Sequence, residues 1–141
     1  MSNYNSVTPE FIDELKTLLG EKYVKTDADT LDRYKTDEEA DERCFHLPDV
    51  VVIPANAEEI AGVVKLCNKY LIPLTVRGGG TGIVDGAIAD KGGVVLLMER
   101  LNKIIELNKE GLYMVAQAGV RTLDIPVSYT HLRAHETGRN L

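Results

Sequence analysis

Tryptophan is absent from this chain of 141 residues, and cysteine occurs only twice, as Cys44 and Cys67. Two cysteines so far apart supply neither a disulfide framework nor a metal-ligand pair, so both are expected to be reduced and structural. No uninterrupted apolar run approaches the roughly 18 residues of a membrane-spanning helix. Residues 1–15 lack the apolar core of a secretory signal. These absences predict a cytoplasmic protein without a transmembrane segment.

The chain also has fewer basic than acidic residues. Lys and Arg number 16 against 22 Asp and Glu, which leaves a formal net charge of −6. Nucleic acids and anionic membrane surfaces attract clustered cations, so neither is expected as the main partner. Hydrophobic residues make up 44% of the chain, which is enough for the core of one domain of this length.

Two segments have the pattern of capped amphipathic helices. In the first, Thr8 is placed to cap the helix, Pro9 takes its first position and Gly20 ends it. In the second, Asn56 and Glu59 form a capping box ahead of an apolar stripe. The stripe consists of Ile60, Val63, Val64, Cys67, Tyr70 and Leu71. A shorter helix is expected near residues 29–34, and the acidic residues 37–43 are expected to form a solvated loop.

Short apolar runs at residues 49–53, 74–76 and 94–97 are predicted strands. Continuous β-branched runs are typical of parallel strands that are buried on both faces, so residues 49–76 are predicted to form a β-α-β unit. Residues 104–107 and 112–117 are two further strand candidates, and residues 108–111 between them have the composition of a hairpin turn. The chain is therefore predicted to be α+β, with a β-α-β core followed by the start of an antiparallel portion.

A glycine-rich segment directly follows the strand at 74–76. Three consecutive glycines remove every Cβ from a turn, so that several backbone N–H groups can face one phosphate or pyrophosphate. A flexible loop without a ligand fits the glycines equally well. A Walker loop is excluded because the nearby Lys91 precedes Gly92 rather than Ser or Thr, and the Rossmann glycine spacing is absent. The segment reads Arg77, Gly78, Gly79, Gly80, Thr81, Gly82.

The order of these elements resembles the N-terminal part of the FAD-linked oxidase family, which shares the FAD-binding fold of vanillyl-alcohol oxidase and p-cresol methylhydroxylase. Within it the chain is most similar to flavin-dependent 2-hydroxyacid dehydrogenases of the glycolate oxidase subunit and D-lactate dehydrogenase type. The chain departs from the family at Asp85, where a small residue is usual, and at Ala89, where proline is common. The motifs that carry the resemblance are residues 48–54, 58–60, 72–82, 86–87, 92–97, 101–104 and 118–120, with Tyr34 and Asp37 ahead of them.

The resemblance implies two α+β subdomains with FAD between them, and a pyrophosphate held by the main-chain N–H groups of residues 78–82. It also implies oxidation of a small 2-hydroxy acid to a 2-keto acid, with hydride passing to the flavin. An electron-transfer flavoprotein or another acceptor would then take the electrons. No catalytic residue is assigned in this chain. The cofactor-binding residues that the resemblance implies are Pro54, Arg77, Gly78, Gly79, Gly80, Thr81, Gly82, Gly86 and Gly119.

The expected organisation is an N-terminal helix and acidic lead-in at 1–47, a partial FAD-binding domain at 48–126 and a non-native tail at 127–141. The resemblance covers about residues 8–125. Family members are several times longer, so an N-terminal fragment is expected. Two alternatives stay open, namely an oxidoreductase of the same fold with another substrate and a truncated, non-catalytic fragment.

Three groups of polar residues carry weaker signals. His131 and His135 are four apart, which on a helix would place two imidazoles on one face, but they lack the pattern of a zinc protease, so no metal site is predicted. His46 is interpreted as an ordinary partly buried histidine rather than a flavin attachment site. Tyr34 and Asp37 are placed either to reach the cofactor or to pack a loop.

Overall fold

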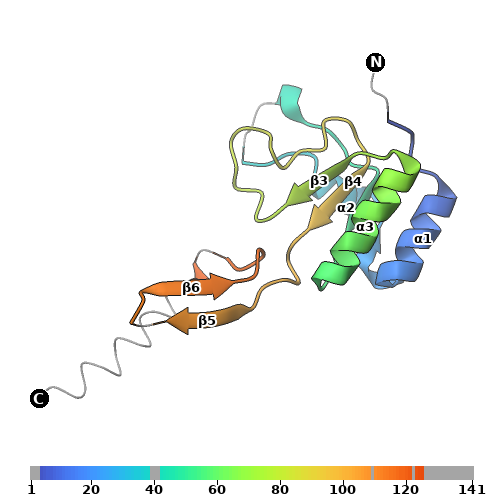
Figure 1. Ribbon diagram of the computed structural model, residues 1–141. Coiled ribbons are helices and arrows are strands. Elements are labelled where there is room, and N and C mark those ends of the chain that lie inside the picture. Colours follow the sequence, from blue (N-terminus) through green and yellow to red (C-terminus); the bar gives the residue numbers. More distant parts are fainter. Residues whose placement is uncertain (1–3, 39–41, 109, 122, 126–141) are drawn as a thin grey trace, which may run out of the picture. The chain divides into compact units, whose positions relative to one another are not determined.

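The computed structural model describes residues 4–38, 42–108, 110–121 and 123–125 (Figure 1). It divides into two compact units, Met1–Arg100 and Leu101–Leu141, which are treated separately below. The expected tail at 127–141, including His131 and His135, lies outside the described residues.

The first unit contains most of the regular structure. Its helices are α1 (Pro9–Leu19), α2 (Ala28–Arg33) and α3 (Ala57–Tyr70), and its short 3-10 turns are η1 (Glu21–Tyr23) and η2 (Glu42–Cys44). Its strands are β1 (Val24–Lys25), β2 (Val50–Val52), β3 (Leu74–Arg77) and β4 (Val94–Leu97). Each helix and long strand predicted from the sequence is present. Strand β1 was not predicted, because two residues are too few to form a pattern.

The first unit is built on a four-stranded sheet in the order β1-β2-β4-β3. Strands β2 and β3 each pair in parallel with β4, whereas β1 is antiparallel to β2. The predicted β-α-β unit is β2-α3-β3, and β4 lies between its two strands. The carboxyl ends of three parallel strands therefore meet at one edge of the sheet.

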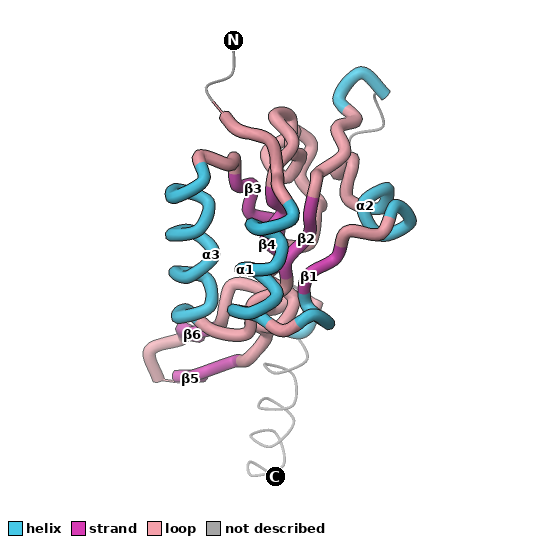
Figure 2. The backbone as a smooth tube through the Cα atoms, turned by 90° about the vertical axis from the view of Figure 1, so that its right-hand side faces the viewer, coloured by secondary structure: helices cyan, strands magenta, loops and turns pink. Residues whose placement is uncertain are grey.

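Helices α1 and α3 lie side by side on one face of this sheet (Figures 1 and 2). Alternate strand residues point to opposite faces, so Val50, Val52, Val94 and Leu96 pack against these helices, together with the fully buried Phe11. Burying each such side chain stabilises the fold by roughly 1.5–3 kcal/mol. The other face carries Val51, Val95 and Leu97 under α2, with Leu31, Tyr34, Ile53 and Ala89.

The predicted helix ends are confirmed in atomic detail. The Thr8 hydroxyl accepts the N–H of Phe11 at the start of α1, and Gly20 ends the helix at φ +88°. At the start of α3, Asn56 Oδ1 accepts the N–H of Glu59 at 2.8 Å. Glu59 Oε2 in return accepts the N–H of Ala55 at 2.7 Å, one residue earlier than in the standard capping box.

The second unit contains an antiparallel hairpin of β5 (Ile104–Asn108) and β6 (Tyr113–Ala116). In its turn, the N–H of Gly111 donates to Asn108 Oδ1 at 2.6 Å. The predicted change from parallel to antiparallel pairing is confirmed, and with it the α+β fold class. No helix within the described part of the chain is long and apolar enough to cross a membrane.

Cys67 provides a test of the packing beneath α3. Its side chain is only 4% exposed, and burial raises the pKa of the thiol from 9.0 to about 11. The folded state therefore holds the thiol proton more tightly than the unfolded chain. This stabilisation is complete below pH 9.0 and is lost as the pH rises towards 11. We expect the free energy of unfolding to fall over this interval by on the order of 2 kcal/mol more in the wild type than in Cys67→Ala.

Denaturant titrations at several pH values between 9 and 11 measure this difference. The Cys44→Ala variant is the control for the loss of a thiol, since Cys44 is only half-buried. Equal pH dependence in the wild type and Cys67→Ala would contradict the burial of this thiol.

Candidate functional site

The glycine loop, defined as residues 78–82, leaves the carboxyl end of β3. Arg77 is level with Leu97 of β4, and Val52 of β2 is level with Leu96. The loop and Pro54 therefore both begin at the carboxyl edge of the parallel strands. In open α/β sheets this edge, at the point where the strand order reverses, is where ligands bind.

A later glycine in the chain, Gly93, has a structural role instead. Gly93 lies at the opposite edge of the sheet, where its N–H donates to Asp49 Oδ2 at 2.6 Å. Its φ is +76°, and a Cβ there would strike the carbonyl of Pro73. Gly93 is thus required by packing, and the glycines of the loop are distinct from it.

The glycine loop presents a bare backbone. Among the described residues, none of the five backbone N–H groups of residues 78–82 donates a hydrogen bond. Four of these residues are exposed, and Gly80 is half-buried with φ +69°. A Cβ on Gly78 would meet no atom within 4 Å. Several backbone donors without a protein acceptor in one short turn are the groups from which anion-binding turns are built.

Arg77 lies beneath this loop and is 8% exposed. Its Nη1 donates to the carbonyl of Thr36 at 2.7 Å and to that of Ala87 at 3.4 Å. Its guanidinium carbon lies 5.5 Å from the ring centre of Tyr34. The resemblance implies that Arg77 binds the cofactor, and the structure places its guanidinium inside the fold.

The lead-in segment, residues 34–38, runs along the glycine loop. Besides the contacts of Tyr34 and Thr36 with Arg77, the N–H of Glu38 donates to the carbonyl of Gly82 at 3.2 Å. Burial, with a smaller contribution from the carboxylate of Glu99, raises the pKa of Tyr34. Tyr34 therefore packs against Arg77, and its reach to the cofactor stays a prediction. Asp37 is also close, with Oδ2 3.7 Å from where a Cβ of Gly82 would lie.

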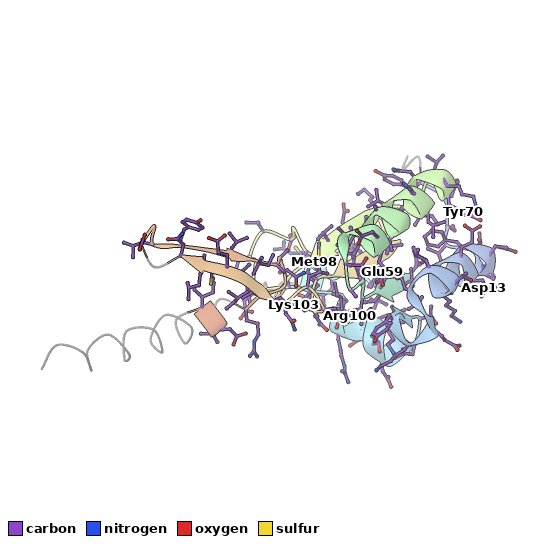
Figure 3. The ribbon with its side chains drawn as sticks, turned by 60° about the horizontal axis from the view of Figure 1, so that its bottom comes forward. Asp13, Glu59, Tyr70, Met98, Arg100 and Lys103 are labelled. Atoms are coloured by element: carbon purple, nitrogen blue, oxygen red, sulfur yellow. The ribbon has the colours of Figure 1, made fainter. Side chains whose placement is uncertain are left out.

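The turn at Pro54 is held by a long-range contact that the sequence analysis missed. Arg100 donates to the carbonyl of Ile53 at 3.0 Å, lies 3.6 Å from the ring centre of Tyr23 and is 3.7 Å from Glu59 Oε2 (Figure 3). No sequence pattern signals this contact, because its members come from four separate segments. Pro54 itself is fully buried.

The remaining candidates are dispersed. Gly86 lies in a turn with open space around it. Gly119 belongs to the second unit, where its N–H donates to the carbonyl of Leu101 at 2.8 Å. Asp85, with φ +58°, has a buried Oδ1 without a hydrogen-bond partner in the described structure. His46 is exposed. No cluster of three or more potential metal ligands occurs within residues 4–38, 42–108, 110–121 and 123–125.

Comparison with known proteins identifies consistent relatives. A family model described as "FAD binding domain" matches residues 48–129, more than half of the chain. The chain is 36% identical over 125 residues to a D-lactate dehydrogenase of Anaerostipes hadrus, covering 86% of this chain and 25% of that protein. It is 38% identical over 79 residues to glycolate oxidase subunit GlcD of Bacillus subtilis strain 168, covering 56% of this chain and 17% of that subunit.

Among solved structures, p-cresol methylhydroxylase with substrate bound matches with a TM-score of 0.78 at 26% identity. The match covers 94% of this chain and 26% of that one. The chain thus spans a quarter or less of the length of these two curated relatives.

The carboxylate of Glu59 should stabilise the Pro54 turn, whereas its neighbour Glu58 is exposed and has no such contacts in the described structure. We expect Glu59→Ala to lower the free energy of unfolding by about 1–2 kcal/mol, because the N–H of Ala55 loses its acceptor and Arg100 its partner. Glu58→Ala removes an equal charge from the same helical turn and should change stability by less than about 0.5 kcal/mol. Equal losses in the two variants, measured by urea denaturation, would show that Glu59 acts only through the helix dipole.

Proposed function

This chain belongs to the FAD binding domain family, and from this membership we propose that its glycine loop binds the pyrophosphate of FAD through main-chain N–H groups. The family confirms the resemblance found in the sequence, the fold class and FAD as the cofactor. The assignment of individual residues is the proposal. The single observation that carries it is the run of five backbone N–H groups, residues 78–82, that donate no hydrogen bond among the described residues.

The residues present fit such a ligand. The loop has no Cβ at Gly78, Gly79, Gly80 or Gly82, and the space that a Cβ on Gly78 would fill is open. A pyrophosphate can therefore approach the backbone closely, which side chains would prevent. Gly80 supplies a positive φ, a conformation that occurs in the backbone turns that bind anions. The buried charge of Arg77 beneath the loop also favours an anion above it.

Other candidates are proposed to contact the rest of the cofactor. Pro54 begins at the same sheet edge as the loop, and its turn is fixed by Glu59 and Arg100. Thr81 adds an exposed hydroxyl to the loop. Gly86 and Gly119 are retained as cofactor-binding residues on the resemblance alone.

For the whole protein we propose the oxidation of a 2-hydroxy acid to a 2-keto acid. The names of the relatives, D-lactate dehydrogenase and glycolate oxidase subunit, support this substrate class. When bound, FAD supplies the acceptor for the hydride that leaves the substrate carbon. The residues of this chain bind and orient the cofactor, and we assign none of them to proton transfer. Electrons would pass on to an electron-transfer flavoprotein or another acceptor.

A second candidate is an oxidoreductase of the same fold that acts on another substrate. The match to p-cresol methylhydroxylase at a TM-score of 0.78 supports it, since that relative carries a phenolic substrate. Both candidates require the same FAD site. They differ in the substrate, so the reduction of bound FAD by D-lactate, glycolate or p-cresol distinguishes them.

The charge at position 79 tests the pyrophosphate assignment. Gly79 has ordinary space for a Cβ, with Thr81 Cγ2 at 3.7 Å, so a side chain there changes the loop little. We expect Gly79→Asp to bind FAD at least about fivefold more weakly than Gly79→Asn, because a carboxylate beside a pyrophosphate costs on the order of 1 kcal/mol or more. The two side chains are matched in size, so the difference isolates charge.

Fluorescence quenching of FAD measures both dissociation constants. Riboflavin, which lacks the pyrophosphate, is the ligand control and should not distinguish Asp from Asn at position 79. Equal FAD affinities for the two variants, with intact binding by the wild type, would place the pyrophosphate away from this loop.

A further inference from the structure

Arg77 raises a question that the binding proposal leaves open. A guanidinium beside an anion loop is expected to contact the anion, but this one is 8% exposed and already donates to the carbonyls of Thr36 and Ala87. Both acceptors belong to the protein, and they lie on the two segments that flank the glycine loop. The charge is thus held inside the fold.

The position of Gly80 shows how close the guanidinium lies to the loop. A Cβ built on Gly80 would stand 2.6 Å from Cζ and 2.8 Å from Nε of Arg77, well inside any real contact. A flexible side chain would simply move aside. Here the guanidinium is anchored by two carbonyls and by the ring of Tyr34, 5.5 Å from Cζ. The backbone of Gly80 therefore rests directly on a fixed planar group.

The same guanidinium joins the lead-in segment to the loop. The side chain of Arg77 donates a hydrogen bond to the carbonyl of Thr36. The N–H of Glu38, two residues after Thr36, donates to the carbonyl of Gly82. The lead-in segment is thus attached at both ends of the glycine loop, by a side chain at one end and by its own backbone at the other. Loss of the first attachment should loosen the second.

We propose that Arg77 is a positioning residue for the glycine loop, which acts by fixing Gly80 and the lead-in segment rather than by contacting the cofactor. The inference rests on the proposed FAD site. Its consequence is that the geometry of the guanidinium matters and a positive charge alone does not suffice. Lysine keeps the charge but has neither the planar face nor the forked donors of arginine.

The experiment compares Arg77→Lys with Arg77→Met in the full chain. We expect both variants to weaken FAD binding by about tenfold or more, since neither keeps the forked hydrogen bonds of the guanidinium, and Arg77→Met to weaken it further because it also removes the charge. We also expect both to accelerate hydrogen exchange of the Glu38 amide, measured by NMR without FAD. Lys91→Met removes an exposed cation further along the chain. It should leave the FAD affinity and the exchange rate of the Glu38 amide at their wild-type values.

A double-mutant cycle with Gly80→Ala supplies a readout that general destabilisation would not reproduce. When Arg77 is present, the methyl group added by Gly80→Ala clashes with the fixed guanidinium, and the substituted residue must also adopt an unfavourable φ of +69°. In the Arg77→Met background only the φ penalty remains. We therefore expect Gly80→Ala to accelerate exchange of the Glu38 amide by a smaller factor in that background, and additive effects would overturn the proposed contact.

Two further results would overturn the proposal. One is an Arg77→Lys variant that binds FAD as the wild type does while Arg77→Met does not, because charge alone would then be sufficient. The other is unchanged exchange of the Glu38 amide in both variants. If the wild-type chain binds no FAD, the proposed function fails, and the exchange measurements still decide whether Arg77 positions the loop.

Discussion

The hydrogen bonds from Arg77 to the carbonyls of Thr36 and Ala87 bring together three segments of the chain, and the segment of Thr36 is distant from the other two in sequence. Arg77 ends β3, Thr36 belongs to the lead-in segment, and Ala87 follows the glycine loop. A buried guanidinium is costly to leave without acceptors, so the three segments are constrained to meet around it. The glycine loop spans the space between them, and its shape depends on all three.

The carboxyl edge of the parallel strands offers two sets of backbone N–H groups, and they differ in their surroundings. At the start of α3, the N–H of Glu59 is taken by Asn56, and the carboxylates of Glu58 and Glu59 oppose an anion. At the glycine loop, the N–H groups have no acceptor among the described residues. Arg77 lies against Gly80, but the carboxylate of Asp37 lies near Gly82, so charges of both signs border the loop. A helix start is a common phosphate site, but in this fold the free backbone donors favour the loop instead.

Local patterns in the sequence were sufficient to predict most of the helices and strands. The caps at Thr8 and Asn56 and the β-branched runs of the strands depend on neighbours a few residues away, so sequence reasoning could place them. The glycine loop was found for the same reason. Strand β1, the place of β4 between β2 and β3, and the contacts of Arg77 and Arg100 depend on partners in remote segments. No pattern along the chain specifies such pairs, and the burial of Arg77 could be known only from the fold.

The central claim is that the main-chain N–H groups of residues 78–82 bind the pyrophosphate of FAD. Amide NMR of the ¹⁵N-labelled full chain during titration with FAD tests it most directly. The account predicts that the amide resonances of these five residues shift together and saturably, and that inorganic pyrophosphate shifts the same set. Saturable FAD binding that leaves all five resonances in place would contradict it.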